Sequence, residues 1–519
     1  MKFYRLIFIV LILFPMLTYA QFDKSDADAN YDDSNYEVAL KQYIKVYKKF
    51  KDDPEVNYRL GICFLYTNDD RTEALRYLKI ADSISKKAIP TMKYDMARAL
   101  FYSKNYNEAE QMAKDYLLEK ISPEQRIEAD RLLEYCKNAR KFTAKPKNVT
   151  FQNLGANVNS KQDDYIPIIT EDEQLLYFTT NRKYNNEYQQ FLKGVFFCQK
   201  EASRQWGIAK SAGAKINTDE HEQLVGLAKD GNEILVHVDR LSAPNDIYIS
   251  KKVKGNFSEL LPLPKNINSK HAEMGASLSK NGDTLFFASD RPGGLGGYDI
   301  YISMKLPTGV WGIPQNMGEP INSPFDENFP YITASGGRLY FTSNGTGSMG
   351  GYDVFFSENL DDGLWAEPVN LGYPINDMYD NFNIVYTSNG RYGYTSKYDP
   401  AGNGGLDICR IIMNDIPPTE VVYTGMVMIS AGEKQMPVHE KPAIQSFVEF
   451  KVINDNTGKE IGTIPVSAKN SKFTFAIGPG NYTVIVKGKG TSEYKKSIYI
   501  ADEQPPEPVI IENVVLSVN

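Results

Sequence analysis

The residues best suited to chemistry in this sequence are acidic pairs that follow a recurring Ile-Asn or Val-Asn dipeptide. They are Asp163-Asp164, Glu220 with Glu222, and Asp326-Glu327. Two carboxyl groups at either of two characteristic separations hydrolyse glycosidic bonds, so the pairs raise the alternative of a glycan-acting enzyme. Their recurrence after each dipeptide favours solvated loop residues of a repeated unit instead. We therefore expect no catalytic residue among them.

A second candidate is a glycine-rich turn followed by an aspartate. Residues 286–303 predict a strand, this turn and a second strand, and 339–357, 393–411, 234–250 and a degenerate 176–198 repeat the pattern. A phosphate-binding glycine loop opens a helix, whereas these glycines precede a strand. The repeated aspartates are Asp246, Asp299, Asp353 and Asp407. We expect them to accept hydrogen bonds from turn amides rather than to bind calcium or a substrate.

The recurring dipeptide sets the period of these repeats. Its asparagines are Asn159, Asn217, Asn268, Asn322 and Asn376, at spacings of 58, 51, 54 and 54 residues. Copies of a four-strand unit at such a period are typical of a β-propeller. The count favours five blades, with six as the alternative. Residues 148–155 match the outer end of a unit, so we expect them to pair with the last blade near 405–412.

The remaining polar residues exclude several kinds of site. The four cysteines are far apart, and the four histidines form no metal-binding motif, so we expect no metal, no disulfide framework and no cofactor. The formal net charge is −7, with no long basic run. Nucleic acid is therefore not an expected partner, because phosphate binding needs concentrated Lys and Arg.

The segment before the repeats has a helical pattern. Ala39, Ala74 and Ala109 are each 35 residues apart, and prolines recur near the expected helix ends. A small residue at a period near 34 is typical of a stack of paired helices, which presents a polar groove to a protein or peptide. The segment thus predicts an all-α array that either binds a partner or only orients its neighbours.

The two ends of the chain complete the expected organisation. Lys2 and Arg5 precede an apolar run and small residues before Gln21, which predicts a signal peptide over 1–20. Short alternating strands after Pro418 predict a small β-sandwich. The expected fold is multidomain: an all-α array over 21–141, an all-β propeller over 142–415 and a β-sandwich over 420–519.

These motifs resemble known families. Leu60-Gly61 and Phe64 with Ala74 resemble a tetratricopeptide repeat, and residues 279–301 resemble the propeller repeats of TolB and related WD-type proteins. The last segment resembles a carboxypeptidase regulatory-like domain. The order is similar to OmpA-family envelope proteins of Bacteroidetes, some of which belong to type IX secretion and gliding machinery. In that family an OmpA-like domain follows, whereas this sequence ends at Asn519, so peptidoglycan anchoring is not carried over.

The resemblance and the lack of an enzyme motif imply a function. We expect a non-catalytic periplasmic scaffold or adaptor that binds an outer-membrane protein complex, such as the type IX secretion, gliding or outer-membrane assembly machinery. Its partners would be outer-membrane and periplasmic proteins, and its membrane association would be indirect. The alternative is a glycan- or peptidoglycan-acting enzyme or binding protein that uses the propeller channel.

Overall fold

The structure is a computed structural model of the 519-residue chain. It describes residues 24–518 except 88, 189, 202–204, 229–230, 241–244, 361–362 and 501–508. The predicted signal peptide, residues 1–20, lies outside the described residues. None of the described helices is both long enough and apolar enough to cross a membrane.

Seven α-helices come first. They are α1 (Lys24–Asp32), α2 (Tyr36–Tyr47), α3 (Pro54–Tyr66), α4 (Ala74–Ile84), α5 (Met92–Tyr102), α6 (Tyr106–Leu117) and α7 (Pro123–Thr143). Asp53 caps α3 by accepting hydrogen bonds from two first-turn amides, and Pro54 suits the first helical position. A Cβ on Gly61 would lie 2.8 Å from Leu78 Cγ, so α3 and α4 pack closely. These helices up to Leu133 form one compact unit.

The rest of the chain is built from strands, and this corrects the expected fold class. The molecule consists mostly of β-strands in several small sheets, and α8 (Pro442–Gln445) is the one α-helix described after α7. The first seven helices are short, 9 to 21 residues each, and they form no large all-α array. The 35-residue period of the alanines indicates that the helices pack closely, but it does not determine how far the helical segment extends along the chain. The prediction of such an array followed by a closed propeller is therefore wrong.

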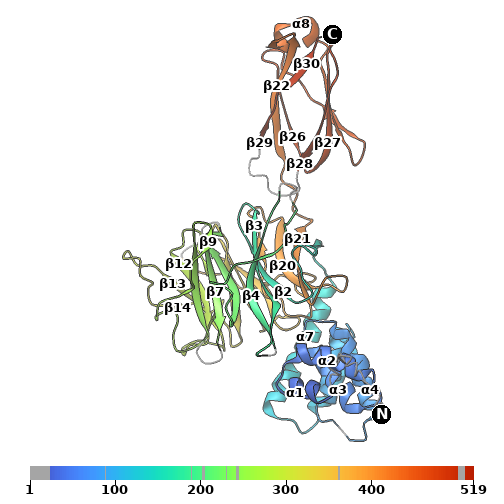
Figure 1. Ribbon diagram of the computed structural model, residues 1–519, viewed down its shortest axis with the longest axis vertical. Coiled ribbons are helices and arrows are strands. Elements are labelled where there is room, and N and C mark those ends of the chain that lie inside the picture. The colour runs from blue at the N-terminus through green and yellow to red at the C-terminus, as the bar shows by residue number, and fades with distance from the viewer. Residues whose placement is uncertain are drawn as a thin grey trace, which may run out of the picture. The chain divides into compact units, whose positions relative to one another are not determined.

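Between Val149 and Met413 the strands form five separate antiparallel sheets (Figure 1, green to orange). The first holds β2 (Asp164–Ile169), β3 (Leu175–Asn185), β4 (Gln190–Gln199) and β5 (Lys210–Ser211). The second holds β6 (His221–Ala228), β7 (Glu233–Asp239), β8 (Asp246–Val253), β9 (Asn256–Phe257) and β10 (Leu261–Pro262). The third holds β11 (Glu273–Leu278), β12 (Thr284–Ser289), β13 (Asp299–Met304) and β14 (Gln315–Asn316).

The fourth sheet holds β15 (Glu327–Ile332), β16 (Arg338–Ser343), β17 (Asp353–Glu358) and β18 (Val369–Asn370). The fifth holds β19 (Val385–Tyr386), β20 (Tyr392–Tyr398), β21 (Leu406–Met413) and β1 (Val149–Asn153). Val149 pairs with Met413 and Asn153 with Cys409, which confirms the predicted pairing of residues near 150 with the last repeat. The strands of the five sheets do not pair into one continuous closed ring.

Two further sheets follow. One has β22 (Val421–Ala431) at its centre, bordered by β23 (Lys434–Pro437), β26 (Lys472–Ile477), β29 (Val509–Ile511) and β30 (Val514–Ser517). The other holds β24 (Glu449–Asn454), β25 (Glu460–Thr463), β27 (Gly480–Lys487) and β28 (Tyr494–Ile500). Alternate residues of β22 and β26 are buried in a core they share with β24 and β27, in which the Phe450 and Phe473 rings lie 4.6 Å apart.

Candidate functional site

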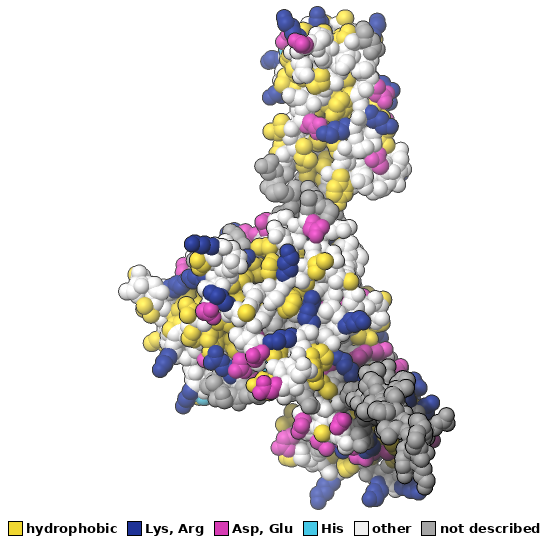
Figure 2. All heavy atoms as spheres, viewed as in Figure 1, with side chains coloured by type: hydrophobic (Ala, Val, Ile, Leu, Met, Phe, Trp, Pro, Cys, Tyr) yellow, Lys and Arg dark blue, Asp and Glu magenta, His cyan; other side chains and the backbone are white. Residues whose placement is uncertain are grey.

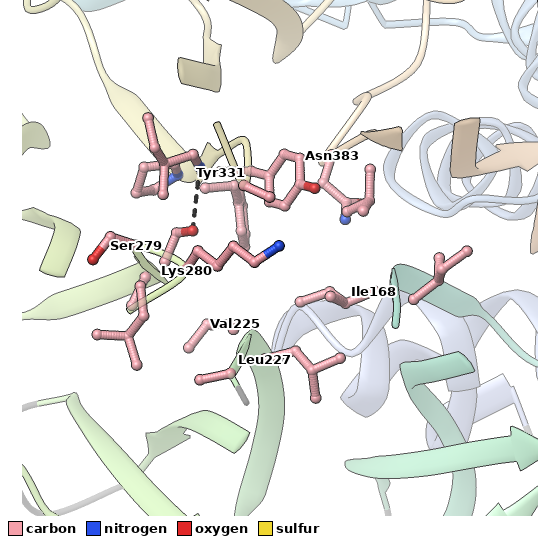
Figure 3. A pocket seen from close by; sticks show the side chains of 18 of the residues that line it. Ile168, Val225, Leu227, Ser279, Lys280, Tyr331 and Asn383 are labelled. Atoms are coloured by element: carbon pink, nitrogen blue, oxygen red, sulfur yellow. Dashed lines mark hydrogen bonds between the residues drawn. The ribbon is translucent and has the colours of Figure 1, made fainter. Parts of the chain in front are cut away.

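A cavity of about 320 Å³ lies among the first strands of the five sheets (Figure 3). Each of β2, β6, β11, β15 and β19 contributes lining residues. Its walls combine aliphatic side chains, such as Ile168, Val225 and Leu227, with polar ones, such as Ser277, Ser279 and Asn383. The cavity is therefore the place where the five sheets could together hold a ligand.

The two ends of the cavity differ in chemistry. Near the start of the lining strands, the ring of Phe382 lies 5.8 Å from that of Tyr165 and 5.9 Å from that of Phe329. At the other end, Lys280 Nζ lies 3.0 Å from Glu171 Oε2, and this ion pair joins turns of the first and third sheets. Of these three rings Phe329 lines the cavity, so one end lies against a cluster of aromatic rings and the other carries a charge pair.

The acidic pairs of the sequence do not line this cavity. Asp164, Glu222 and Glu327 are at most 1% exposed, so the interpretation as solvated loop residues is wrong for them. Each accepts a hydrogen bond from the amide of the residue four positions before it. Glu273 occupies the same place in the third sheet, and Asn381 in the fifth. The sequence carries a signal for both, since each lies five residues after a recurring asparagine.

The more exposed member of two pairs contacts a neighbouring sheet instead. Asp326 Oδ1 accepts a hydrogen bond from the Tyr298 amide at 3.0 Å, and Asp163 Oδ1 accepts one from the Leu406 amide at 2.8 Å. Asp380, which sequence reasoning missed, accepts one from Tyr352 at 3.0 Å. These carboxylates join the third sheet to the fourth, the fourth to the fifth and the fifth to the first.

Arginine partners two of the buried acids. Arg182 Nη2 lies 2.6 Å from Asp164 Oδ1, and Arg291 Nη2 lies 2.9 Å from Glu273 Oε1. The Arg291 guanidinium also lies over the Phe287 and Tyr301 rings, at 4.9 and 5.0 Å. A buried carboxylate with a bonded and stacked arginine is well compensated, and its oxygens are occupied.

Glu222 and Glu327 have no described arginine partner, and Glu327 accepts hydrogen bonds from the Ser323 and Ser343 hydroxyls instead. Arg240 is 18 residues further on, as Arg291 is from Glu273, but it lies over the Tyr248 ring and makes no described ion pair with Glu222. Glu222 Oε2 is buried without a hydrogen-bond partner. Burial raises the pKa of Glu222 to about 7.

The repeated aspartates lie at the starts of the third strands. Oδ2 of Asp299, Asp353 and Asp407 accepts a hydrogen bond from the amide four residues earlier, at 2.8, 2.9 and 2.7 Å. A Cβ on Gly294 would lie 1.7 Å from Asp299 Oδ2, so this turn needs glycine for the close approach. The turn before Asp246 lies outside the described residues, and the first sheet has Gly194 at this position.

The recurring asparagines share one geometry. Each accepts a hydrogen bond from the amide of a third-strand residue and donates one to the carbonyl of that same residue. The pairs are Asn159 with Ile408, Asn217 with Val195, Asn268 with Ile247, Asn322 with Ile300 and Asn376 with Val354.

A second asparagine, six residues earlier, supports three of them through its Oδ1. These are Asn153, Asn316 and Asn370. Sequence reasoning missed these three asparagines. Each begins an Asn-x-Gly motif shortly before the Ile-Asn or Val-Asn dipeptide, and this motif could have identified them.

The other oxygen of each repeated aspartate is unusual. Oδ1 of Asp246, Asp299, Asp353 and Asp407 is buried without a described partner, and burial raises the pKa of all four carboxyls. No group of three or more His, Cys, Asp or Glu side chains in the described part of the chain could hold a metal ion. The structural role of the aspartates and asparagines stays a prediction.

No family model matches the chain, and no curated protein matches it. Similar solved structures include TolB from Acinetobacter baumannii, at 13% identity and a TM-score of 0.30, covering 48% of this chain and 54% of TolB. An endo-arabinase from Bacteroides thetaiotaomicron is 14% identical, with a TM-score of 0.31 over 51% of this chain and 96% of the enzyme. A Dyadobacter fermentans protein of unknown function is 13% identical, with a TM-score of 0.33 over 52% of this chain and 84% of that one. Membership of a Bacteroidetes envelope family stays a prediction.

Proposed function

We propose that this chain is a non-catalytic scaffold or adaptor of the periplasm that binds outer-membrane proteins. The observation that carries the proposal is the placement of the acids that were candidates for catalysis. One member of each pair is buried in a hydrogen-bond network within its sheet, Asp163 and Asp326 bond a neighbouring sheet, and none lines the cavity. Groups held in this way stabilise a binding surface rather than activate water or a sugar.

The cavity itself supports the same proposal. Glycoside hydrolysis requires two carboxyl groups around the scissile bond. Among the described lining residues Glu171 is the one carboxylate, and it is paired with Lys280. A glycan-acting function is therefore the weaker candidate, and it enters as an outcome of the test below.

The helical unit offers a surface suited to protein contacts. The Tyr36 and Tyr66 rings stack with centroids 4.9 Å apart, and the Arg98 guanidinium lies 4.5 Å from the Tyr66 ring and 5.8 Å from that of Tyr94. Tyr66 is 53% exposed. Tyrosine is among the residue types that carry much of the binding energy of protein interfaces, and the half-buried Arg98 holds the exposed Tyr66 ring in place.

Charge distribution agrees with protein partners. On the face drawn in Figure 2, Lys and Arg side chains alternate with Asp and Glu rather than gathering into one basic field. Nucleic acid is accordingly not a proposed partner. The resemblance of the sequence to Bacteroidetes envelope proteins supports a place in type IX secretion, gliding or outer-membrane assembly machinery.

Affinity capture of the tagged full-length protein from detergent-solubilised envelope tests the proposal. We expect an integral outer-membrane protein to be captured in a stoichiometric amount, and Tyr66→Ala with Arg98→Ala to reduce it several-fold. Arg76→Ala is the matched control, because Arg76 also lies over a tyrosine, 5.2 Å from the Tyr77 ring, but on α4. A protein that runs as a free monomer and cleaves a glycan or peptidoglycan panel would overturn the scaffold role.

A further inference from the structure

We propose that the central cavity binds a small amphipathic anion, with its apolar body among the first strands and its acidic group at Lys280. This ligand site goes beyond the scaffold role and does not depend on it. The inference stands on the shape of the cavity, the chemistry of its walls and the position of its lysine.

The walls favour an apolar body. Ile168, Val225, Leu227 and Leu278 come from three different sheets and present hydrocarbon to the cavity, which Val385 extends on a fourth. Polar groups such as Ser277, Ser279 and Asn383 line the cavity as well, so the site suits an amphipathic molecule rather than a purely apolar one. Burial of an aromatic or aliphatic group there is favourable in proportion to its area.

The size of the cavity limits the ligand. A volume of about 320 Å³ is at the small end of the range for ligand sites, roughly 300 to 1,000 Å³. The Tyr165, Phe329 and Phe382 rings lie together at the end where β2 and β15 begin. The Lys280–Glu171 ion pair, by contrast, is exposed to solvent, so it marks an accessible end of the cavity.

Lys280 supplies the charge preference. It is the cation among the described lining residues, and in Figure 3 its side chain extends across the cavity from beside Ser279, with Val225 and Leu227 on one side. Its ion pair with Glu171 is exposed, at 63% and 49% of the two side chains. An exposed pair of this kind contributes about 0 to 1 kcal/mol, so an incoming anion can replace Glu171 as the partner of Lys280.

Two fluorescent probes of nearly the same shape test both parts of the inference. N-phenyl-1-naphthylamine is neutral, and 8-anilinonaphthalene-1-sulfonate adds one sulfonate to the same ring system. With the full-length protein we expect both to bind at one site per chain, and the sulfonate to bind more tightly. Leu227→Trp, which fills the cavity, should abolish binding of both, with circular dichroism confirming that the variant is folded.

Charge variants separate the lysine from the apolar walls. Lys280→Met should weaken binding of the sulfonate about fivefold to tenfold, a loss of about 1 to 1.4 kcal/mol, and leave the neutral probe unchanged. Glu171→Gln should strengthen sulfonate binding, because it releases Lys280. Lys251→Met is the matched control, since Lys251 is 57% exposed and lies 3.1 Å from Glu233, outside the cavity lining.

The inference fails if neither probe binds the wild-type protein. It also fails if folded Leu227→Trp binds both probes normally, which would place them on the outer surface. Equal loss of sulfonate binding in Lys280→Met and Lys251→Met would show a general charge effect and would overturn the role of Lys280.

Discussion

The second and third sheets hold the same buried glutamate in two different electrostatic settings. Glu222 and Glu273 are each at most 1% exposed, and each accepts a hydrogen bond from the amide four residues earlier. Arg291 is bonded to Glu273, whereas no described ion pair reaches Glu222, although Arg240 stands at the equivalent position. The repeated structure therefore requires the hydrogen-bonded turn but not the arginine.

The difference between Glu222 and Glu273 indicates the role of the repeated polar residue. An acidic residue whose carboxyl group accepts a hydrogen bond within a turn occurs in both sheets, whether or not an arginine neutralises its charge. Where the arginine is missing, the free-energy cost of burial appears as a raised pKa at Glu222. The same residue type at the same place thus has different charged partners in neighbouring sheets.

Removal of the arginine should have the largest effect. We expect Arg291→Met to destabilise the five-sheet region by about 3 to 5 kcal/mol, because it leaves the Glu273 carboxylate buried without its partner. Urea unfolding followed by tryptophan fluorescence measures this, since Trp206, Trp311 and Trp365 all lie in that region. Arg240→Met is the control and should cost under about 1 kcal/mol. Equal losses in the two variants would contradict the difference between the sheets.

The contribution of Glu222, which has no arginine partner, to the free energy of unfolding should depend on pH. The pKa of Glu222 is raised to about 7 in the folded protein, above a value near 4.3 in the unfolded chain, so the folded state binds the proton more tightly. Titration of Glu222 therefore lowers the free energy of unfolding by about 3 kcal/mol as the pH rises from about 4.3 to 7, and contributes no further change above that.

Glu222→Gln removes this titration. Relative to the wild type, we expect the variant to gain about 3 kcal/mol on going from pH 4.5 to pH 8, measured by urea unfolding at both values. If the difference in unfolding free energy between the variant and the wild type is the same at both pH values, Glu222 is ionised at both pH values. That result would refute the contrast with Glu273.

Loss of the asparagine hydrogen bonds should destabilise the protein less than the changes at Arg291 and Glu222. Asn322→Ala removes the two hydrogen bonds to Ile300, at 2.8 and 2.9 Å, and we expect a loss of about 2 kcal/mol. Asn359→Ala is the control, because Asn359 makes one exposed hydrogen bond, to the Gly336 carbonyl at 3.2 Å. Thermal unfolding of the two variants should separate them clearly, and equal melting temperatures would count against the structural assignment of the asparagines.

Sequence reasoning predicted the strand repeats well because glycine turns and alternating residues are local signals. The pairing of residues near 150 with the last repeat also followed from the matching motif and is confirmed. It missed Glu273 and the burial of Glu222, because an acidic residue after a turn has the same pattern whether its side chain faces water or a neighbouring sheet. The cavity depends on how five distant strands converge, and the extent of the helical segment depends on packing. Neither is encoded in a local pattern.

The most direct test of the account is calorimetry of the wild type and Asp353→Ala, each with and without calcium. Asp353 is fully buried and accepts hydrogen bonds from the Met349 amide and Asn370 Nδ2, so its loss should cost about 1 to 3 kcal/mol. We expect the melting temperature of the variant to be lower by roughly 2 to 10 °C, and calcium to change neither protein. An unchanged melting temperature in the variant, together with loss of a calcium response that the wild type shows, would contradict the claim that the repeated aspartates stabilise the turns of the sheets.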